Sequence, residues 1–417
     1  MTDPRPATRR QHRLRKMAGR DPSEHGRAAT PLELLFDLTF VVAFAQASDQ
    51  LSHLVAKGHV GSALAAFAFV IFAVTWAWIN FSWFASAFDT DDWFFRVTTM
   101  VQMVGVIVLA LGIPPVFASI DAGAPPDNTV LVAGYIVMRV AMLAQWTRVA
   151  VQDPEHRRVA LGYVTTIGIA QLGWTALAIF DVPNEFLVIG FVVLYAIELS
   201  GPILAERRGG GTPWHPHHIA ERYGLLVIIA LGEGILGTIA TVSALVGRVG
   251  WSVETVFVVI AGVGITFGAW WNYFIVPSGD FLARHPRRAW GWGYGHIVIF
   301  GSIVAMGAGL HVAAYVVEGE ATIGVVGAVL ASAIPVLIFT IAYFALYSFL
   351  VRAIDPFHVL LFVGTVAVLA LAVALAAAGW TMGTCLVVLM AAPVVTIVGF
   401  EAVGHRHMAA AVEALTR

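Results

Sequence analysis

The chain has 417 residues, of which 59% are hydrophobic and 12% charged, and its formal net charge is -2. Soluble globular domains carry about 25% charged residues, so this chain has too little polar surface to face water and is not a soluble globular protein. Because Cys385 is its single cysteine, an internal disulfide and a cysteine-based metal site are both excluded.

The chain opens with a polar, basic segment. Residues 1–30 hold eight Lys or Arg residues and no apolar run, so no cleavable signal peptide is expected before the first span. We expect residues 1–30 to form a disordered basic tail in the cytoplasm.

Twelve apolar runs follow this tail. A helix that spans a membrane needs about 20 mostly apolar residues. The sequence therefore predicts an all-α, polytopic transmembrane bundle of about twelve spans in a lipid bilayer. The runs cover residues 32–55, 62–86, 96–118, 129–149, 158–181, 184–205, 223–246, 251–276, 291–316, 322–350, 356–379 and 383–404.

The basic residues predict the orientation of these spans. With twelve spans and the N-terminus inside, 21 of the 24 Lys and Arg residues lie in segments on the cytoplasmic side. Basic residues near span ends remain in the cytoplasm. We therefore expect both termini to be cytoplasmic, with residues 122 and 320 on the outer side and residue 212 inside.

The spans divide into two halves of six. Residues 31–206 form the first half, 207–222 a polar cytoplasmic connector, 223–405 the second half, and 406–417 a cytoplasmic C-terminal tail. The segment with Trp78 and Asn80 in span two resembles the segment with Trp270 and Asn272 in span eight. An even number of spans would make the halves parallel repeats. A chance likeness between two apolar stretches is the alternative.

Five ionisable residues inside predicted spans stand out. These are Glu33, Asp37, Arg139, Glu198 and Glu233. Each costs at least about 2.5–3.5 kcal/mol in a membrane unless it meets a partner or water. They either line a path for a solute or ion, or they only let the bundle close through ion pairs.

Arg139 needs a partner most clearly. Arg139 and Glu233 both lie about ten residues into their spans, near the middle of the membrane. Since an unpaired buried charge is costly, we expect Arg139 to approach a carboxylate, with Glu233 first and Asp37 second.

The connector ends in a cluster of polar residues. Three histidines (His215, His217, His218) precede Glu221 and Arg222 at the start of span seven. Two histidines and a glutamate could bind a metal. The proline between the first two histidines prevents the three from sharing one helical face, so we expect no zinc site. A helix cap or a gate is the remaining interpretation.

Other polar and aromatic residues have simpler readings. We group Asn80, Asn272 and His296 with the connector as gating or structural positions, the histidine being either a packing residue or a ligand. Trp76 and Trp78 belong to an aromatic cluster that an interfacial belt explains. No phosphate-binding, hydrolase or metalloprotease motif is present, so no cofactor, metal or nucleic acid is expected.

Two stretches carry a family resemblance. "TPLELLFDLTFVVAFAQ" (Thr30–Gln46) and "WHPHHIAERYGLLVIIALGEGIL" (Trp214–Leu236) resemble the ELFFDLVFVFA and HIAERFGLFTIIVLGE segments of the bacterial low temperature requirement A (LtrA) family. Leu35 stands where the family usually has an aromatic residue. The resemblance implies a bacterial multi-span membrane protein, with these signature polar positions: Glu33, Asp37, His218, Glu221, Arg222 and Glu233.

A fainter resemblance concerns architecture alone. Lysosomal-type potassium channels open each six-helix repeat with an Arg-x-x-x-Phe-Ser-Asp motif, and Phe36-Asp37 lacks the intervening serine.

Three functions fit these features. A transporter or channel for a small solute or ion is favoured by the two halves and the charges in mid-membrane. An intramembrane enzyme acting on a lipid-like substrate is the alternative, because several polar groups gather near one face. A membrane sensor or assembly factor without turnover is the third. Association into a homo-oligomer is left open.

Overall fold

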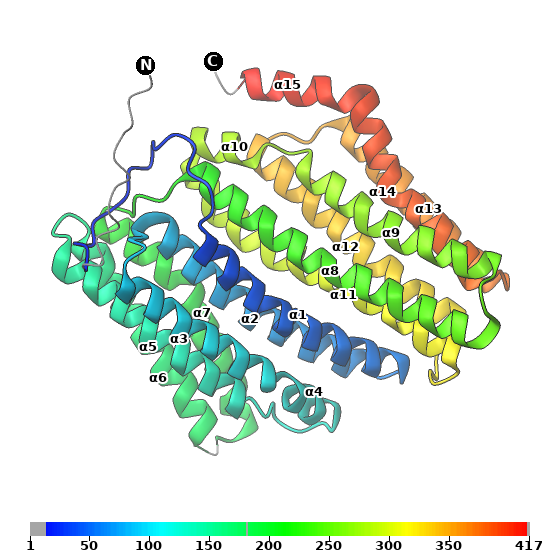
Figure 1. Ribbon diagram of the computed structural model, residues 1–417, viewed down its shortest axis with the longest axis horizontal. Coiled ribbons are helices and arrows are strands. Elements are labelled where there is room, and N and C mark those ends of the chain that lie inside the picture. The colour runs from blue at the N-terminus through cyan, green and yellow to red at the C-terminus, as the bar shows by residue number, and fades with distance from the viewer. Residues whose placement is uncertain (1–13, 181, 415–417) are drawn as a thin grey trace, which may run out of the picture.

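The computed structural model describes residues 14–180 and 182–414 (Figure 1), and within these ranges every regular element is a helix. Twelve of the helices, some with a short helix appended, are long and apolar enough to cross a membrane. The predicted all-α bundle of twelve spans is confirmed.

The first six spans use seven helices. The third span breaks at Gly112, where a proline-containing helix continues the run in a new direction. The helices are α1 (Pro31–Ala56), α2 (Val60–Phe88), α3 (Trp93–Leu111), α4 (Ile113–Asp121), α5 (Thr129–Gln152), α6 (Arg157–Ile179) and α7 (Asn184–Gly209).

Three of the last six spans combine a long helix with one or two short helical segments. Pro335 and Pro393 lie inside two of the six spans, which neighbouring helices tolerate in a membrane bundle. The elements are α8 (Pro216–Val249), α9 (Val253–Phe274), α10 (Ser278–Arg284), a 3₁₀ turn (Pro286–Arg288), α11 (Ala289–Glu318), α12 (Val325–Val351), α13 (Pro356–Ala377), α14 (Met382–Gly399), a π-helical turn (Phe400–Gly404) and α15 (His405–Ala414).

Local sequence sets the start of the two helices that open the halves. Thr30 caps α1, and the Glu33 side chain accepts a hydrogen bond from the Thr30 amide, 2.8 Å away. Together these bonds form a capping box. The ring of His215 accepts a hydrogen bond from the His218 amide at the start of α8, and Pro216 fits the first helical turn. A proline follows each cap.

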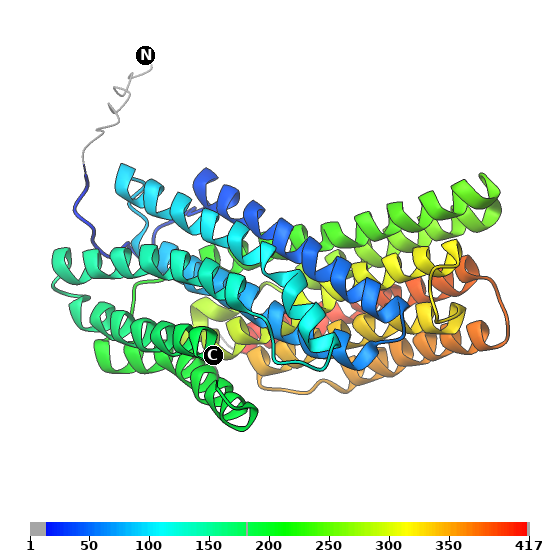
Figure 2. The same ribbon diagram turned by 90° about the horizontal axis from the view of Figure 1, so that it is seen from below.

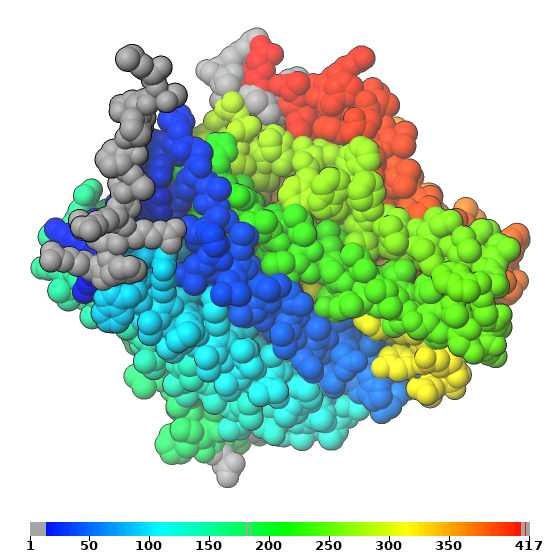
Figure 3. Space-filling model, in the orientation of Figure 1, coloured from blue at the N-terminus to red at the C-terminus, as the bar shows by residue number. Residues whose placement is uncertain are grey.

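The two halves meet along α1 and α8. α1 packs against α2, α3, α8 and α11, and α8 packs against α9 and α11 as well. Figures 1 and 3 show α1 running diagonally between the two halves, with α8 beside it. We call the end of the bundle where α1 begins the proximal end, and the opposite end the distal end. The described parts of both chain termini lie at the proximal end (Figure 1).

Two helices lie at the edge of the first half. α6 and α7 pack mainly against each other, and α6 also contacts α5. Figure 2 shows this pair apart from the centre of the bundle. Most of their surface is therefore left to lipid.

The N-terminal segment corrects the prediction of a disordered tail. Residues 14–30 lie across the proximal ends of the first-half helices as an irregular strap, whereas residues 1–13 lie outside the described residues. Met17 is fully buried, the Arg20 amide donates to the Ala87 carbonyl, and Arg27 donates to the carbonyls of Ala85 and Ser86. The basic, polar composition of this segment suggested disorder. The strap is ordered because its donors bind carbonyl groups at the end of a helix.

Candidate functional site

A buried ion cluster joins α1 to α8 near the proximal end. Arg222 contacts Glu33 at 2.8 Å and Asp37 at 2.5 Å, and all three side chains are fully buried. Glu33 and Asp37 are four residues apart, so both project from one face of α1 toward α8. We call Glu33, Asp37, His218 and Arg222 the signature cluster. It brings together four of the six signature positions.

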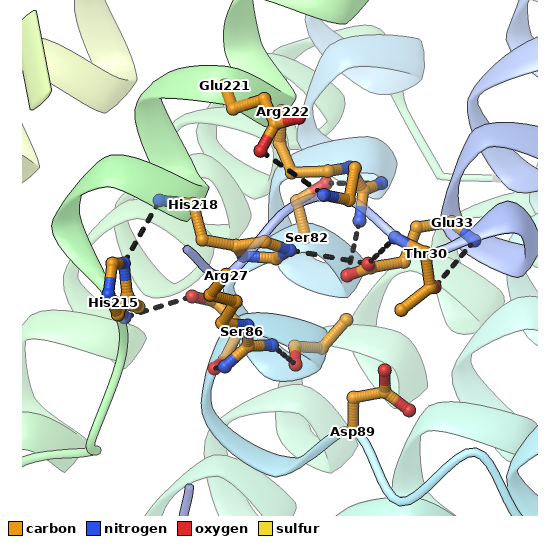
Figure 4. A network of polar contacts seen from close by, with 12 residues as sticks. Arg27, Thr30, Glu33, Ser82, Ser86, Asp89, His215, His218, Glu221 and Arg222 are labelled. Atoms are coloured by element: carbon orange, nitrogen blue, oxygen red, sulfur yellow. Dashed lines mark hydrogen bonds and ion pairs between the residues drawn. The ribbon is translucent and has the colours of Figure 1, made fainter. Parts of the chain in front are cut away.

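His218 completes the signature cluster (Figure 4). Its Nε2 atom lies 3.3 Å from a Glu33 oxygen, and the ring is fully buried. Two carboxylates and one guanidinium sum to one negative charge, and a proton on His218 would balance it. Glu221 lies outside the cluster, exposed at the surface, where it accepts a hydrogen bond from the Ala29 amide of the strap.

Two tryptophans of α2 correct the prediction of an interfacial belt. Trp78 donates to Asp37 at 2.6 Å and Trp76 donates to Glu198 at 2.6 Å, and both rings are buried. They therefore satisfy buried carboxylates. Sequence reasoning missed this role because it placed both residues at the membrane interface.

Arg139 pairs with a different carboxylate from the one predicted. Its Nη2 atom lies 2.8 Å from Glu198 of α7, and its Nη1 atom lies 3.4 Å from Asn80. The expected pairing with Glu233 or Asp37 is wrong. The reason is that α5 packs against α3 and α6 and makes no principal contact with α8. Asp37 is already bound by Arg222.

Glu233 lies midway along α8 and has no cationic partner. It is 2% exposed, and no Lys, Arg or His within the described ranges forms an ion pair with it. The Ser48 hydroxyl of α1, otherwise without a partner in the described chain, faces it. A Cβ atom at Gly307 would lie 2.5 Å from the Glu233 carbonyl carbon, so glycine lets α11 press against this point.

Polar groups extend from Glu233 toward the distal end. Asp49 of α1 is in electrostatic range of Glu233, His311 and Tyr315, and the Tyr315 ring lies 6.1 Å from His53. Toward the proximal end, buried apolar side chains separate Glu233 from Arg222. These two residues are eleven positions, or about 16 Å, apart along the helix. Glu233 is thus closer to polar groups on the distal side.

The other predicted positions lie apart. Asn80 donates to the Trp76 carbonyl, and Asn272 donates to the Pro393 carbonyl in the second half. His296 bonds to the Trp292 carbonyl and to Tyr273, which makes it a packed core histidine. Outside the cluster, His217 is exposed and lies 3.8 Å from Asp280.

Charged groups at the proximal end surround the signature cluster (Figure 4). Burial and the nearby Glu33 raise the pKa of Asp89 to about 6, and burial lowers the pKa of Arg27 to about 10. Burial also lowers the pKa of His215. Asp92 is buried, caps α3 and pairs with Arg148. This end is therefore a tightly packed ionic layer.

Twelve membrane-crossing helices with ion pairs inside the bundle define a multi-pass integral membrane protein. The chain belongs to the family of bacterial low temperature requirement A (LtrA) proteins, whose model matches residues 28–393. The family resemblance of the two signature segments is thereby confirmed.

One curated relative is "Uncharacterized protein RA0937" of Rhizobium meliloti (strain 1021). It is 26% identical over 309 residues, which cover 70% of each chain. No solved structure matches the chain.

Proposed function

We propose that this protein is a transporter or channel for a small solute or ion in the bacterial cytoplasmic membrane, and that Glu233 is its ion-binding group. The observation that carries the proposal is the uncompensated carboxyl of Glu233, midway along a spanning helix. A charge at such depth is costly, and residues that bear one are typical of ion and proton pathways.

A proton is the ion that suits Glu233. An isolated ionised carboxylate in an apolar setting takes up a proton in preference to remaining charged. Hard metal cations need about six oxygen ligands. The described side chains offer Glu233 and the hydroxyl of Ser48 there, and within the described ranges no group of three acidic, His or Cys residues is arranged so that it could hold a metal ion. Glu233 therefore alternates between a protonated and an ionised form.

The location of Glu233 suits alternating access. It lies on α8 of the second half, faces α1 of the first half and packs against α11. A movement between the halves would change which side reaches it. α1 packs on α2 and α3 much as α8 packs on α9 and α11, which favours two parallel repeats.

The basic residues orient this pathway. Since the proximal end carries the strap, the connector and most of the arginines, we assign it to the cytoplasm. The polar groups from Asp49 to His53 then lead to the outer side, and the signature cluster closes the cytoplasmic side. We also assign Asn80 and Glu198, which both contact Arg139, to a separate route between α2, α5 and α7.

Currents from purified protein in proteoliposomes on a solid-supported membrane test this proposal. A panel of inorganic cations, anions, amines and organic acids is applied to wild type, Glu233→Gln and Glu318→Gln, the last being an exposed glutamate on α11. We expect at least one compound to give a current in wild type and Glu318→Gln that Glu233→Gln lacks. The proposal is overturned if no compound exceeds protein-free vesicles, or if Glu233→Gln carries the wild-type current.

A further inference from the structure

The outward face of α1 carries a row of side chains that the rest of the described chain leaves exposed or half-buried. Figure 3 shows α1 at the surface of the bundle, with α3 on one side and α8 on the other. The three apolar residues near the proximal end of the row are between 48% and 56% exposed. We call this row the α1 stripe, and its members are Leu35, Leu38, Val42, Ala45, Asp49 and His53.

The α1 stripe is apolar at its proximal end and polar at its distal end. Its members follow one another at intervals of three or four residues, which places them on one face of the helix. Helices that pack side by side use the same interval. Gln46 and Gln50 flank the polar end, both half-buried, and Gln50 donates to Asp49 at 3.2 Å.

Asp49 does not fit a face that meets lipid. It lies about six residues, or about 8 Å along the axis, from the middle of α1. Half of the hydrocarbon core is about 15 Å thick, so Asp49 lies within it. Asp49 is exposed, and no Lys, Arg or His of the described residues forms an ion pair with it. Acidic residues inside a membrane are almost always turned toward other protein or toward water, so this one requires a neighbour that the single chain does not supply.

We propose that the α1 stripe is the contact surface of a homodimer, in which a second copy of this chain lies against it across a two-fold axis along the membrane normal. A two-fold interface uses the same patch on both copies. The apolar end of one α1 stripe therefore meets the apolar end of the other, and the two polar ends face each other away from lipid.

The polar end of the α1 stripe is complementary to a second copy of itself. Asp49 offers acceptor oxygens, whereas His53, Gln46 and Gln50 offer donors. Two-fold symmetry brings the acceptors of each copy toward the donors of the other. Polar side chains that bond across helices are typical of contacts between membrane spans. Lipid tails offer neither donors nor acceptors, so a second copy satisfies this surface and lipid does not.

The dimer also affects the outer approach to Glu233. Ser48, whose hydroxyl faces Glu233, directly precedes Asp49 on α1. The polar ends of the two α1 stripes therefore line one outer approach that both copies share. This consequence rests on the proposed function, whereas the dimer itself does not.

Cysteine cross-linking in the membrane tests the contact. The native Cys385 is fully buried, so an introduced cysteine reports on its own position. Leu35→Cys, Leu38→Cys and Val42→Cys are each oxidised with copper phenanthroline, and at least one should give a disulfide-linked dimer. Leu172→Cys, at a residue of α6 that is 73% exposed, should remain monomeric. The proposal is overturned if none of the three cross-links, or if they join the chain to a different protein.

Dilution in lipid measures the stability of the dimer. Full chains labelled at the C-terminus with donor or acceptor dyes are reconstituted together, and energy transfer is followed as lipid is added. Val42→Trp enlarges the middle of the α1 stripe without making it polar, so it should raise the dissociation constant at least about tenfold through overpacking. Leu172→Trp is the matched control and should associate as wild type.

Two results of the dilution contradict the dimer. One is the absence of energy transfer in wild type at every lipid ratio, and the other is equal association of Val42→Trp and wild type. Neither experiment records flux, so a monomeric chain leaves the transport proposal standing, and absence of transport leaves the dimer standing.

Discussion

The signature cluster and Glu233 lie on the same interface between α1 and α8. The carboxylates of the cluster are paired with a cation, whereas the Glu233 carboxyl is not. In the cluster, Arg222 bridges Glu33 and Asp37, and Trp78 and His218 supply further contacts. At Glu233, one serine hydroxyl faces the carboxyl, and no cationic side chain of the described residues pairs with it. Both groups of side chains are buried.

This difference indicates that the charges of the signature cluster stabilise the bundle, whereas the protonation state of Glu233 can change. A buried pair is costly to break because the remaining partner is left uncompensated. A lone buried carboxyl avoids that cost by taking a proton. The cluster is therefore expected to be fixed in its charge state, and Glu233 to be variable. Substitutions should reveal opposite responses at the two places.

Arg222→Leu should have the largest effect. It removes the single cation between Glu33 and Asp37, and breaking one buried pair typically costs about 3–5 kcal/mol. We expect loss of folded protein, measured as monodisperse yield in detergent. Replacing both carboxylates with their amides in the same background should recover part of the yield. A wild-type yield of Arg222→Leu would contradict the structural role of the cluster.

The Arg139–Glu198 pair should respond next. Arg139→Leu and Glu198→Leu each leave one uncompensated charge, so each should lower the free energy of unfolding by about 3–5 kcal/mol. The double substitution should recover most of this loss, less about 1–3 kcal/mol for the unpaired Trp76 indole. Chemical denaturation of the four proteins gives the coupling energy. Additive losses would show that the pair is not coupled.

Asp89→Asn should have a smaller effect on stability, and this effect should depend on pH. Because its folded-state pKa of about 6 exceeds the unfolded value near 3.9, the native state holds this proton more tightly. That stabilisation is complete below about pH 4 and is lost as pH rises to about 6, a change of roughly 3 kcal/mol. Relative to wild type, Asp89→Asn should therefore gain stability over this range.

Thermal unfolding of both proteins from pH 4 to pH 7 measures the Asp89 effect. Asp91→Asn, at an exposed residue paired with Arg96, is the matched control and should follow wild type. Parallel pH profiles for Asp89→Asn and wild type would mean that neither burial nor the Glu33 charge raises the pKa of Asp89 in the folded protein.

Glu233→Gln should have the smallest effect on stability. An amide replaces a neutral carboxyl of the same shape without leaving a buried charge, so the free energy of unfolding should remain within about 1 kcal/mol of wild type. Asp37→Asn, at the paired carboxylate, should by contrast destabilise clearly. Chemical denaturation of the two variants measures both free energies of unfolding. A larger loss in Glu233→Gln than in Asp37→Asn would contradict the contrast between the two sites.

Much of the architecture could be predicted, because apolar runs and charged loops can be identified from short stretches of the sequence. Twelve spans follow from runs of about 20 apolar residues, and the depth of Arg139 follows from counting along its helix. The start of α1 at Thr30 is likewise visible as a cap three residues before Glu33. These features need no knowledge of which helices are neighbours.

The pairing of charges could not be predicted, because it depends on helix neighbours and on rotation about the helix axis. Counting along the helices predicted a similar depth for Arg139 and Glu233, but Arg139 faces Asn80 of α2 and Glu198 of α7. Trp76 and Asn80 are four residues apart and so share one face of α2, which could have indicated a polar contact there. The order of residues 14–30 could not be predicted either, because it depends on contacts such as those of Arg27 with carbonyls at the end of α2.

Infrared difference spectroscopy of Glu233 tests the central claim most directly. Spectra of purified wild type minus Glu233→Gln are recorded while pH is raised, with Glu318→Gln as the control. We predict a carboxylic acid band assigned to Glu233 that converts into a carboxylate band within the pH range where the protein remains folded. Absence of the acid band at every pH would show that Glu233 is permanently ionised, and would contradict its role as an exchangeable proton site.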